Sequence, residues 1–377
     1  MRSLPNTHQS PRSRSLLAAC AIALVGLACL AAPGGANAVP KAPQDFLGVV
    51  PQAEFSRLDT QRMKRGKVRH MRIALAWATV EGVRGTYNFD YVDQMFRYAA
   101  REGVRLMPTL YGTPGWMSKD WTRLPVANSN QITKWRQFVA AMVKRYGSGG
   151  EFWKEPQQID SNLPKLPVRD WQIWNETNFH YFATPVSPGR YAKLVRASSS
   201  VIRNADPRAN VVLAGLYARP KGPASKARHA DTYLRQLVAN VPRSSFDVIA
   251  IHPYAADTAR LRSIMRSYRN AANRMGLRSK PIYIDEIGWG SGPRTNAFLL
   301  GSKRRQATQV KSALNYLLGD RHRLRLRRVY WFAWKDLPRN VQTCSFCYSI
   351  GLFEPGAKRL VAKPAWRTFV KFTRGRP

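Results

Sequence analysis

Residues 171–176 read WQIWNE and residues 283–289 read YIDEIGW. Each stretch is a β-like run of mostly apolar residues that leads into an acid, Glu176 in the first and Glu286 in the second. In a parallel sheet, the residues that follow the strands all lie at the same edge, so two acids 110 positions apart in the sequence can share one site. The two stretches therefore predict a pair of carboxylates in one cleft.

Both stretches belong to an alternation of short β-like runs and helical patterns that continues from Pro40 to the end of the chain. Residues 211–214 and 248–251 are apolar without alternation, which is typical of parallel strands buried on both faces. Eight strand–helix alternations predict an α/β fold, either a closed barrel or an open doubly wound sheet. The predicted strands are residues 46–50, 69–77, 104–111, 168–175, 210–216, 246–252, 281–286 and 329–334.

The helical segments carry apolar stripes with a period of 3.6 residues. In residues 131–146 the stripe runs from Ile132 to Tyr146, and Asn130 is the expected N-cap. Ser187 and Pro188 are expected to open the next long helix as its N-cap and first helical residue. No break in composition marks a second domain, so residues 39–377 are predicted to form a single domain.

The two acidic stretches resemble the motifs of clan A of the glycoside hydrolases, and their surroundings resemble family 39 most. The resemblance covers nearly all of residues 39–377 and implies a closed (β/α)8 TIM barrel. It also implies a retaining O-glycoside hydrolase that works by double displacement, with Glu176 as acid/base and Glu286 as nucleophile. Such a mechanism uses one protonated and one ionised carboxyl group, roughly 5 Å apart, and requires no metal or organic cofactor.

The same resemblance implies roles for residues near the two acids. Asn175 is expected to bind the 2-hydroxyl of the sugar, and Tyr254, in the run His252-Pro253-Tyr254, to hold the nucleophile by a hydrogen bond. Arg72, in the second strand, is expected to steady the same carboxylate. Two plainer alternatives remain open: His252 as a satisfied polar residue at the barrel mouth, and Arg72 as part of a salt bridge without catalytic meaning.

Tryptophans are the candidates for contact with sugar rings, because an aromatic face covers the C–H surface of a pyranose. The resemblance implies that Trp334, in the last strand, forms the floor of the subsite for the cleaved sugar. Trp116, Trp121 and Trp289 are further stacking candidates, although tryptophan is also common in protein cores. The chain departs from the pattern at Tyr111, where many clan members have histidine, so sugar recognition is expected to differ there.

The N-terminus has the features of a secretory signal. Arg2, Arg12 and Arg14 precede an apolar run over residues 16–32, and a cleavage motif of small residues ends at Ala38. Residues 1–38 are therefore predicted to be removed, which implies a secreted, extracytoplasmic protein that meets the membrane only through this segment. The alternatives are a membrane anchor, for which the run is short, and a lipoprotein modified at Cys20, which would have almost no apolar region before it.

Only Cys344 and Cys347 remain after removal of the predicted signal. In an oxidising compartment, a close pair of this kind favours a local disulfide. A thioredoxin-like redox site needs the pair at the start of a helix, and a zinc site needs two further ligands, which do not occur nearby in the sequence.

The chain is strongly basic, with a formal net charge of +39. Without the three arginines of residues 1–38, 58 basic residues face 22 acidic ones, which leaves +36. A charge of this size attracts anionic polymers, so the carbohydrate substrate is predicted to be acidic or associated with the cell wall. The basic run at 321–328 lacks the interleaved aromatics that stack on bases, so no specific nucleic acid is expected. The simpler alternative is that the basic residues form a solvated exterior without a specific partner. The chain is expected to be a monomer.

Two other classes of function compete with the enzyme. The first is a non-catalytic glycan-binding or cell-wall-binding protein on a TIM-barrel scaffold, because a fold alone does not imply activity. The presence of both acids together with Asn175, Tyr254 and Arg72 argues against it. The second is a basic protein that binds polyanions, which predicts salt-sensitive binding independent of either acid.

Overall fold

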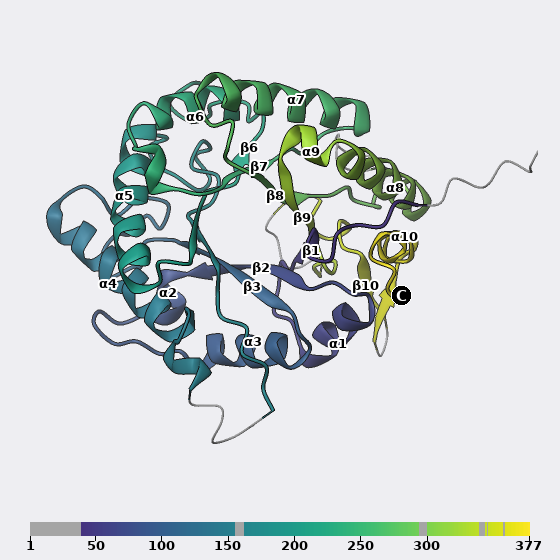
Figure 1. Ribbon diagram of the computed structural model, residues 1–377, viewed down its shortest axis with the longest axis horizontal. Helices are drawn as coiled ribbons and strands as arrows, with labels where there is room; N and C mark the ends of the chain where they lie inside the picture. The colour runs from purple at the N-terminus through teal and green to yellow at the C-terminus, as the bar shows by residue number, and fades with distance from the viewer. Residues whose placement is uncertain (1–38, 155–161, 294–299, 339–343, 345, 357–358) are drawn as a thin grey trace, which may run out of the picture. The chain divides into compact units, whose positions relative to one another are not determined.

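The computed structural model describes residues 39–154, 162–293, 300–338, 344, 346–356 and 359–377. Val39–Pro377 form one compact unit, in which helices surround a central ring of strands (Figure 1). The predicted signal, residues 1–38, lies outside the described residues. Among the described residues, no helix combines the length and apolar character needed to cross a membrane.

Strands β1 to β9 form one parallel sheet that closes on itself. The order of its strands is β5-β4-β3-β2-β1-β9-β8-β7-β6. β5 and β6 are two parts of one predicted strand, interrupted at Ala214 and Gly215. A parallel bridge between Val212 and Val248 joins the two ends of the sheet, with the Leu213 N–H donating to the Val248 carbonyl at 3.0 Å. The predicted (β/α)8 barrel is therefore confirmed. The strands are β1 (Leu47–Val50), β2 (His70–Ala76), β3 (Arg105–Tyr111), β4 (Asp170–Ile173), β5 (Asn210–Leu213), β6 (Leu216–Tyr217), β7 (Ile249–His252), β8 (Ile282–Ile287) and β9 (Leu326–Phe332).

Helices follow the strands and cover the outside of the barrel (Figure 1). Several begin at side-chain caps: Ser187 accepts from the Arg190 N–H, with Pro188 as first helical residue, as predicted. The predicted cap at Asn130 is wrong, because α4 starts two residues earlier and Asn128 caps it by accepting from the Gln131 N–H. The helices are α1 (Arg57–Arg65), α2 (Trp77–Val80), α3 (Asp90–Arg101), α4 (Ser129–Tyr146), α5 (Pro188–Ala205), α6 (Ala230–Val238), α7 (Thr258–Arg274), α8 (Lys303–Gly319), α9 (Arg321–Leu324) and α10 (Pro364–Thr373), with 3-10 turns at Glu151–Trp153 and Arg243–Ser245.

Two apolar clusters make up the core. The larger lies between the strands and the surrounding helices. The smaller fills the inside of the barrel, where Tyr283 and Tyr330 pack with Met107, and Phe332 lies against this cluster. The barrel is thus a packed core that closes the site from below rather than a pore. A short antiparallel hairpin, β10 (Phe353–Pro355) with β11 (Leu360–Ala362), follows β9.

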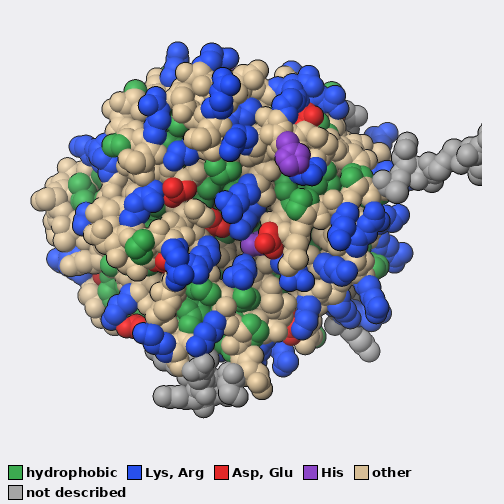
Figure 2. Space-filling view, in the orientation of Figure 1, with side chains coloured by type: hydrophobic (Ala, Val, Ile, Leu, Met, Phe, Trp, Pro, Cys, Tyr) green, Lys and Arg blue, Asp and Glu red, His purple; other side chains and the backbone are tan. Residues whose placement is uncertain are grey.

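The surface carries the excess positive charge. Figure 2 shows Lys and Arg side chains distributed over the visible face, with only a few acidic side chains among them. Several of the acids are engaged in the interior: Asp170 pairs with Arg328 at 2.7 Å, and Asp285 is fully buried.

Candidate active site

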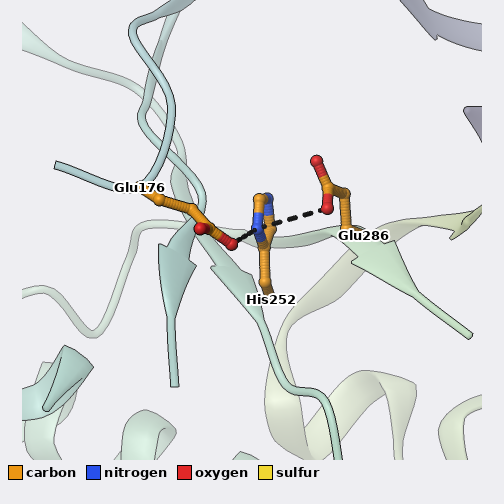
Figure 3. A group of neighbouring side chains, drawn as sticks. All are labelled: Glu176, His252 and Glu286. Atoms are coloured by element: carbon orange, nitrogen blue, oxygen red, sulfur yellow. Dashed lines mark hydrogen bonds and ion pairs between the residues drawn. The ribbon is translucent and has the colours of Figure 1, made fainter. Parts of the chain in front are cut away.

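Glu176 and Glu286 meet at the carboxyl end of the barrel. Glu176 follows β4, and Glu286 lies at the end of β8. One carboxylate oxygen of each, together with a ring nitrogen of His252, all lie within 4.8 Å of one another (Figure 3). The structure thus brings together two acids from distant strands, as the sequence predicts.

A strained turn aims Glu176 into this group. Trp174 and Glu176 have positive φ angles of 67° and 39°, in the left-handed region that residues with a Cβ rarely adopt. Neighbouring segments hold the turn: the Trp174 indole donates to the Phe182 carbonyl at 2.6 Å, and the Glu176 N–H donates to the Gly215 carbonyl at 3.1 Å. The direction of the Glu176 side chain is therefore set by contacts of this turn with Phe182 and Gly215.

Both oxygens of Glu286 are held by donors. Arg72 Nη1 lies 2.6 Å from Oε1, and the Tyr254 hydroxyl donates to Oε2 at 3.0 Å. Arg72 also donates from Nη2 to Asn175 Oδ1 at 2.7 Å and from Nε to Gln172 Oε1 at 2.6 Å. A single guanidinium thus fixes Glu286 and Asn175 relative to each other, using the planar fork that distinguishes arginine from lysine.

Glu176 occupies a different environment. The residue is only 8% exposed, and its Oε1 lies 2.6 Å from His252 Nδ1. Burial raises the pKa of Glu176, and the charge of Glu286 adds to the increase, while contact with His252 acts in the opposite direction. The two acids therefore have distinct surroundings, as a proton donor and a charged partner require.

His252 lies between the acids and is fully buried. Its Nδ1 is 3.5 Å from Glu286 Oε2, and its Nε2 is 3.2 Å from Asp285 Oδ2. Burial alone would lower the pKa of His252, but the charges of Glu286 and Asp285 and the contact with Glu176 outweigh it and raise that pKa to about 10. Because the pKa of Glu176 is raised as well, this pair keeps at least one proton near neutral pH.

Asp285 is a site residue that the sequence reasoning missed. It is buried, accepts from Gln172 Nε2 at 2.6 Å, and lies 3.4 Å from Arg72 Nε. Adjacent residues of a regular strand point to opposite faces, so Asp285 and Glu286 are not expected to face the same site. The pairing of β8 with β9 shifts register between Ile284 and Ile287, which allows both acids to turn toward His252.

The charge of His252 gives a prediction on pH dependence. An imidazole whose pKa is raised by folding contributes stability that is complete below its unfolded pKa of about 6.5 and is lost as pH rises through about 10. We expect the Asp285→Asn variant, which removes one of the charges that raise this pKa, to lose stability at lower pH than the wild type. Thermal unfolding measured from pH 6 to pH 10 checks this.

The partly exposed acid Asp320, which pairs with Arg323, supplies the control. The Asp320→Asn variant should keep the wild-type pH profile because it is remote from His252. If Asp285→Asn and the wild type lose stability over the same pH range, Asp285 does not sustain the charge of His252.

Gly215 leaves room for this cluster. A Cβ added there would lie 2.1 Å from His252 Nε2 and 2.3 Å from Asp285 Oδ2. We expect Gly215→Ala to displace the imidazole, to lower the free energy of unfolding by about 1–3 kcal/mol, and to reduce activity. Denaturant unfolding and kinetic assays measure both effects. Gly319→Ala, where a Cβ meets nothing within 4 Å, is the matched control, and an equal effect of both variants would contradict the steric argument.

Two of the tryptophans predicted to stack on sugars lie elsewhere. Trp334 is fully buried, donates to Asp59 Oδ1 at 3.0 Å, and packs against Trp366. Trp289 is also fully buried, and its indole donates to the Ala255 carbonyl at 2.7 Å. Neither presents a face to a ligand, so both assignments are corrected.

Strand β9 ends at Phe332, two residues earlier than predicted. Phe332 rather than Trp334 therefore approaches the site, with its ring centroid 6.4 Å from that of Tyr254.

The other two stacking candidates differ in exposure. Trp116 is partly buried, donates to the Glu81 carbonyl at 2.8 Å, and packs edge-on against Trp77. Its role in sugar stacking stays a prediction. Trp121 is 45% exposed and contacts Tyr111, the residue at the end of β3, with ring centroids 6.0 Å apart. Trp121 is therefore the better placed of the two to meet a ligand.

Tyr217, in β6, is a further residue that sequence reasoning missed. Its ring centroid lies 6.2 Å from that of Tyr254. Burial, together with the charge of Glu176, raises the pKa of Tyr217 to about 12, which keeps its hydroxyl protonated. The only signal in the sequence was its place near the end of a predicted strand.

The structure joins Cys344 and Cys347 by a disulfide. Within this loop, the ring centroid of Phe346 lies 5.9 Å from that of Tyr254, and the Cys347 carbonyl accepts from Gln52 Nε2 at 2.7 Å. The disulfide loop therefore borders the site rather than lying apart from it.

Glu176, His252 and Glu286 also have the spacing of a three-ligand metal site. A metal ligand must be a neutral imidazole, whereas the surrounding carboxylates favour the protonated form of His252. Ion pairing accounts for the geometry of the three side chains.

A (β/α)8 barrel that carries two convergent carboxylates at the carboxyl ends of β4 and β8 is the arrangement that glycoside hydrolysis by paired carboxylates uses. The chain matches the family model for the glycosyl hydrolase catalytic core over residues 120–349, and a beta-galactosidase model over residues 50–184. The first match covers more than half of the chain, so the chain belongs to the glycosyl hydrolase catalytic core family. The resemblance to clan A glycoside hydrolases is confirmed.

Solved structures share the fold at low sequence identity. A family 39 glycoside hydrolase from the gut symbiont Bacteroides cellulosilyticus WH2 is 18% identical, with a TM-score of 0.63 over 88% of this chain and 64% of its own. A monomeric beta-xylosidase from Caulobacter crescentus CB15 is 16% identical, with a TM-score of 0.63 over 88% and 69%. An exo-beta-1,4-mannosidase from Opitutaceae bacterium strain TAV5 is 16% identical, with a TM-score of 0.58 over 87% and 59%. The chain thus spans about three fifths to two thirds of these proteins. A comparison with curated proteins finds no match.

Proposed function

We propose that the chain is a secreted retaining glycoside hydrolase in which Glu286 is the nucleophile and Glu176 the acid/base. The observation that carries the proposal is the spacing of the two acids, whose nearest oxygens lie within 4.8 Å. Retaining enzymes hold their carboxyl groups about 5 Å apart, whereas inverting enzymes leave about 6.5–9.5 Å for a water molecule. The difference in environment between the acids supports the division of roles.

In the first step, an oxygen of Glu286 attacks the anomeric carbon while the glycosidic C–O bond breaks and Glu176 transfers its proton to the leaving oxygen. The sugar is then an ester of Glu286. In the second step, Glu176 takes a proton from water, the water oxygen attacks the anomeric carbon, and the bond to Glu286 breaks. The buried charge of His252 beside Glu176 stabilises the carboxylate that the second step requires.

Asn175 supports the same proposal from the side of the sugar. Its Oδ1 accepts from Arg72, so its amide nitrogen is the group left to donate a hydrogen bond to a ligand. We infer that this amide binds the 2-hydroxyl, where hydrogen bonds that strengthen in the transition state accelerate glycosidases.

The stereochemical course tests the proposal. We expect the first product released from an aryl glycoside to have the same anomeric configuration as the substrate, because two displacements at one carbon restore it. Proton NMR recorded before mutarotation measures the configuration. A panel that includes aryl β-xylosides and β-mannosides is suitable, since similar folds occur in a beta-xylosidase and an exo-beta-1,4-mannosidase. Release of the inverted anomer would defeat the assignment of Glu286 as nucleophile.

We also propose that the protein is exported and begins at Val39. The support is the basic start, apolar run and Ala38 cleavage motif of residues 1–38. Expression of the full chain in a bacterial host, followed by N-terminal sequencing of the extracytoplasmic fraction, tests this. Retention of residues 1–38 on the protein, anchored in the membrane, would contradict cleavage.

A further inference from the structure

We propose that an aromatic platform formed by Phe179, Tyr181 and Tyr217, together with the basic loop at residues 218–229, binds the leaving-group part of an acidic polysaccharide. The inference rests on the proposed function, because the role of Glu176 defines which side of the site receives the leaving group. The inference adds a second binding region, outside the group of residues that surrounds Glu286, and it names a class of substrate for the enzyme.

The platform extends from the catalytic group to the surface. The ring centroid of Tyr217 lies 6.2 Å from that of Tyr254, that of Phe179 lies 5.5 Å from Tyr217, and that of Tyr181 lies 4.8 Å from Phe179. Tyr217 and Phe179 are partly buried, whereas Tyr181 is 63% exposed. A large aromatic side chain left open at the end of such a series is suited to cover the C–H face of a sugar.

The position of the platform identifies the part of the substrate that it meets. Its loop begins at the proposed acid/base, and the Phe179 N–H donates to the Glu176 carbonyl at 2.9 Å. A general acid must lie beside the oxygen that it protonates, which is the oxygen of the leaving group. Residues that continue outward from Glu176 therefore border the leaving-group sugars rather than the sugar that is attached to Glu286.

The platform is held rigidly by the loop that follows β6. Phe179 and Ala227 form an antiparallel bridge, and the His180 N–H donates to the Lys226 carbonyl at 2.8 Å. Asn178 is fully buried, donates to the Tyr217 carbonyl at 2.7 Å, and accepts from the Tyr217 N–H at 3.0 Å. Because these aromatics are already ordered, a ligand meets a preformed surface and the entropic cost of binding is reduced.

The positive charge beside the platform favours binding of an acidic polysaccharide. Residues 218–229 contain Arg219, Lys221, Lys226 and Arg228 and no acid, and residues 177–190 contain no acid either. Arg219, Lys221 and Lys226 are exposed. No ion pair joins any of these three to an acid within the described part of the chain. Aromatic faces next to cations without acidic partners match sugar rings that carry carboxylates, whereas a neutral glycan would use the aromatic faces alone.

Binding to a matched pair of polymers tests the proposal. Polygalacturonate and its fully methyl-esterified form share one backbone and differ in charge, and isothermal titration calorimetry of the full protein measures the affinity for each. We expect the wild type to bind the acidic form at least about tenfold more tightly. The double variant K221A/K226A should lose about tenfold in affinity for the acidic form only. Tyr181→Ala should lose about fivefold for both forms, because it removes a stacking face.

The control is the double variant R304A/K311A, which removes the same charge from the exposed side of α8. It should bind polygalacturonate as the wild type does and should hydrolyse aryl glycosides at the wild-type rate. Equal losses in the two double variants would show general attraction by a basic surface and would overturn the proposal, as would equal affinity of the wild type for both polymers. A wild type that binds polygalacturonate but cleaves no aryl glycoside overturns the proposed function instead.

Discussion

The Glu286→Gln variant is expected to lose about four to six orders of magnitude in kcat/KM for an aryl glycoside, the range found when a covalent nucleophile is removed. An amide has nearly the size and shape of the carboxylate, so Arg72 and Tyr254 keep a partner of similar geometry. The amide cannot form the ester with the anomeric carbon, and the reaction loses its first step. Steady-state kinetics with the most reactive aryl glycoside measures the loss.

A fold control and a direct label complete this test. Glu354, which pairs with Lys303 on the surface, gives the matched control Glu354→Gln, which should retain wild-type activity. Thermal unfolding of Glu286→Gln should remain cooperative. A 2-fluoro glycoside that reacts with the wild type should add its mass to the peptide that contains Glu286. Residual activity within tenfold of the wild type, or a label on another peptide, contradicts the assignment.

The fold is largely predictable from the sequence, because parallel strands and amphipathic helices leave periodic signals. The eight predicted strands occur in order, and their bounds shift by at most three residues; β9, for example, starts at Leu326 rather than at residue 329. The convergence of Glu176 and Glu286 follows from topology, since the carboxyl ends of barrel strands share one mouth. These features depend on local patterns and on the general geometry of barrels.

Features that depend on the end of a strand, on its register or on a contact with another loop were not predictable. Phe332 and Trp334 are two positions apart, so in a continuous strand their side chains would point to the same face. Because β9 ends at Phe332, Phe332 approaches the site while Trp334 packs against Trp366. The inward turn of Asp285 beside Glu286 follows from a register shift between β8 and β9, which leaves no mark in the local sequence. Likewise, Tyr217 reaches the site because Asn178, from another loop, fixes its backbone.

Glu176→Ala is expected to separate substrates by their leaving groups. Glycosides with poor leaving groups should lose about four orders of magnitude in kcat/KM, near the upper end of what general acid catalysis contributes. Dinitrophenyl glycosides need no proton for departure, so they should still form the ester with Glu286 and then accumulate it, because no base remains to activate water. Pre-steady-state kinetics should therefore show a burst of dinitrophenol, followed by slow turnover.

Added azide should restore turnover of the activated substrate in Glu176→Ala, because the small anion fits the space left by the side chain and attacks the ester without a base. His252, whose Nδ1 lies 2.6 Å from the position of the lost carboxylate, offers a positive charge to hold it. The product should be a glycosyl azide of the substrate's configuration. Glu176→Gln fills the same space and should show no rescue, which makes it the control for the cavity. Equal losses for poor and activated leaving groups, with no effect of azide, would contradict the acid/base role of Glu176. They would not bear on the role of Glu286 as nucleophile, which is tested separately.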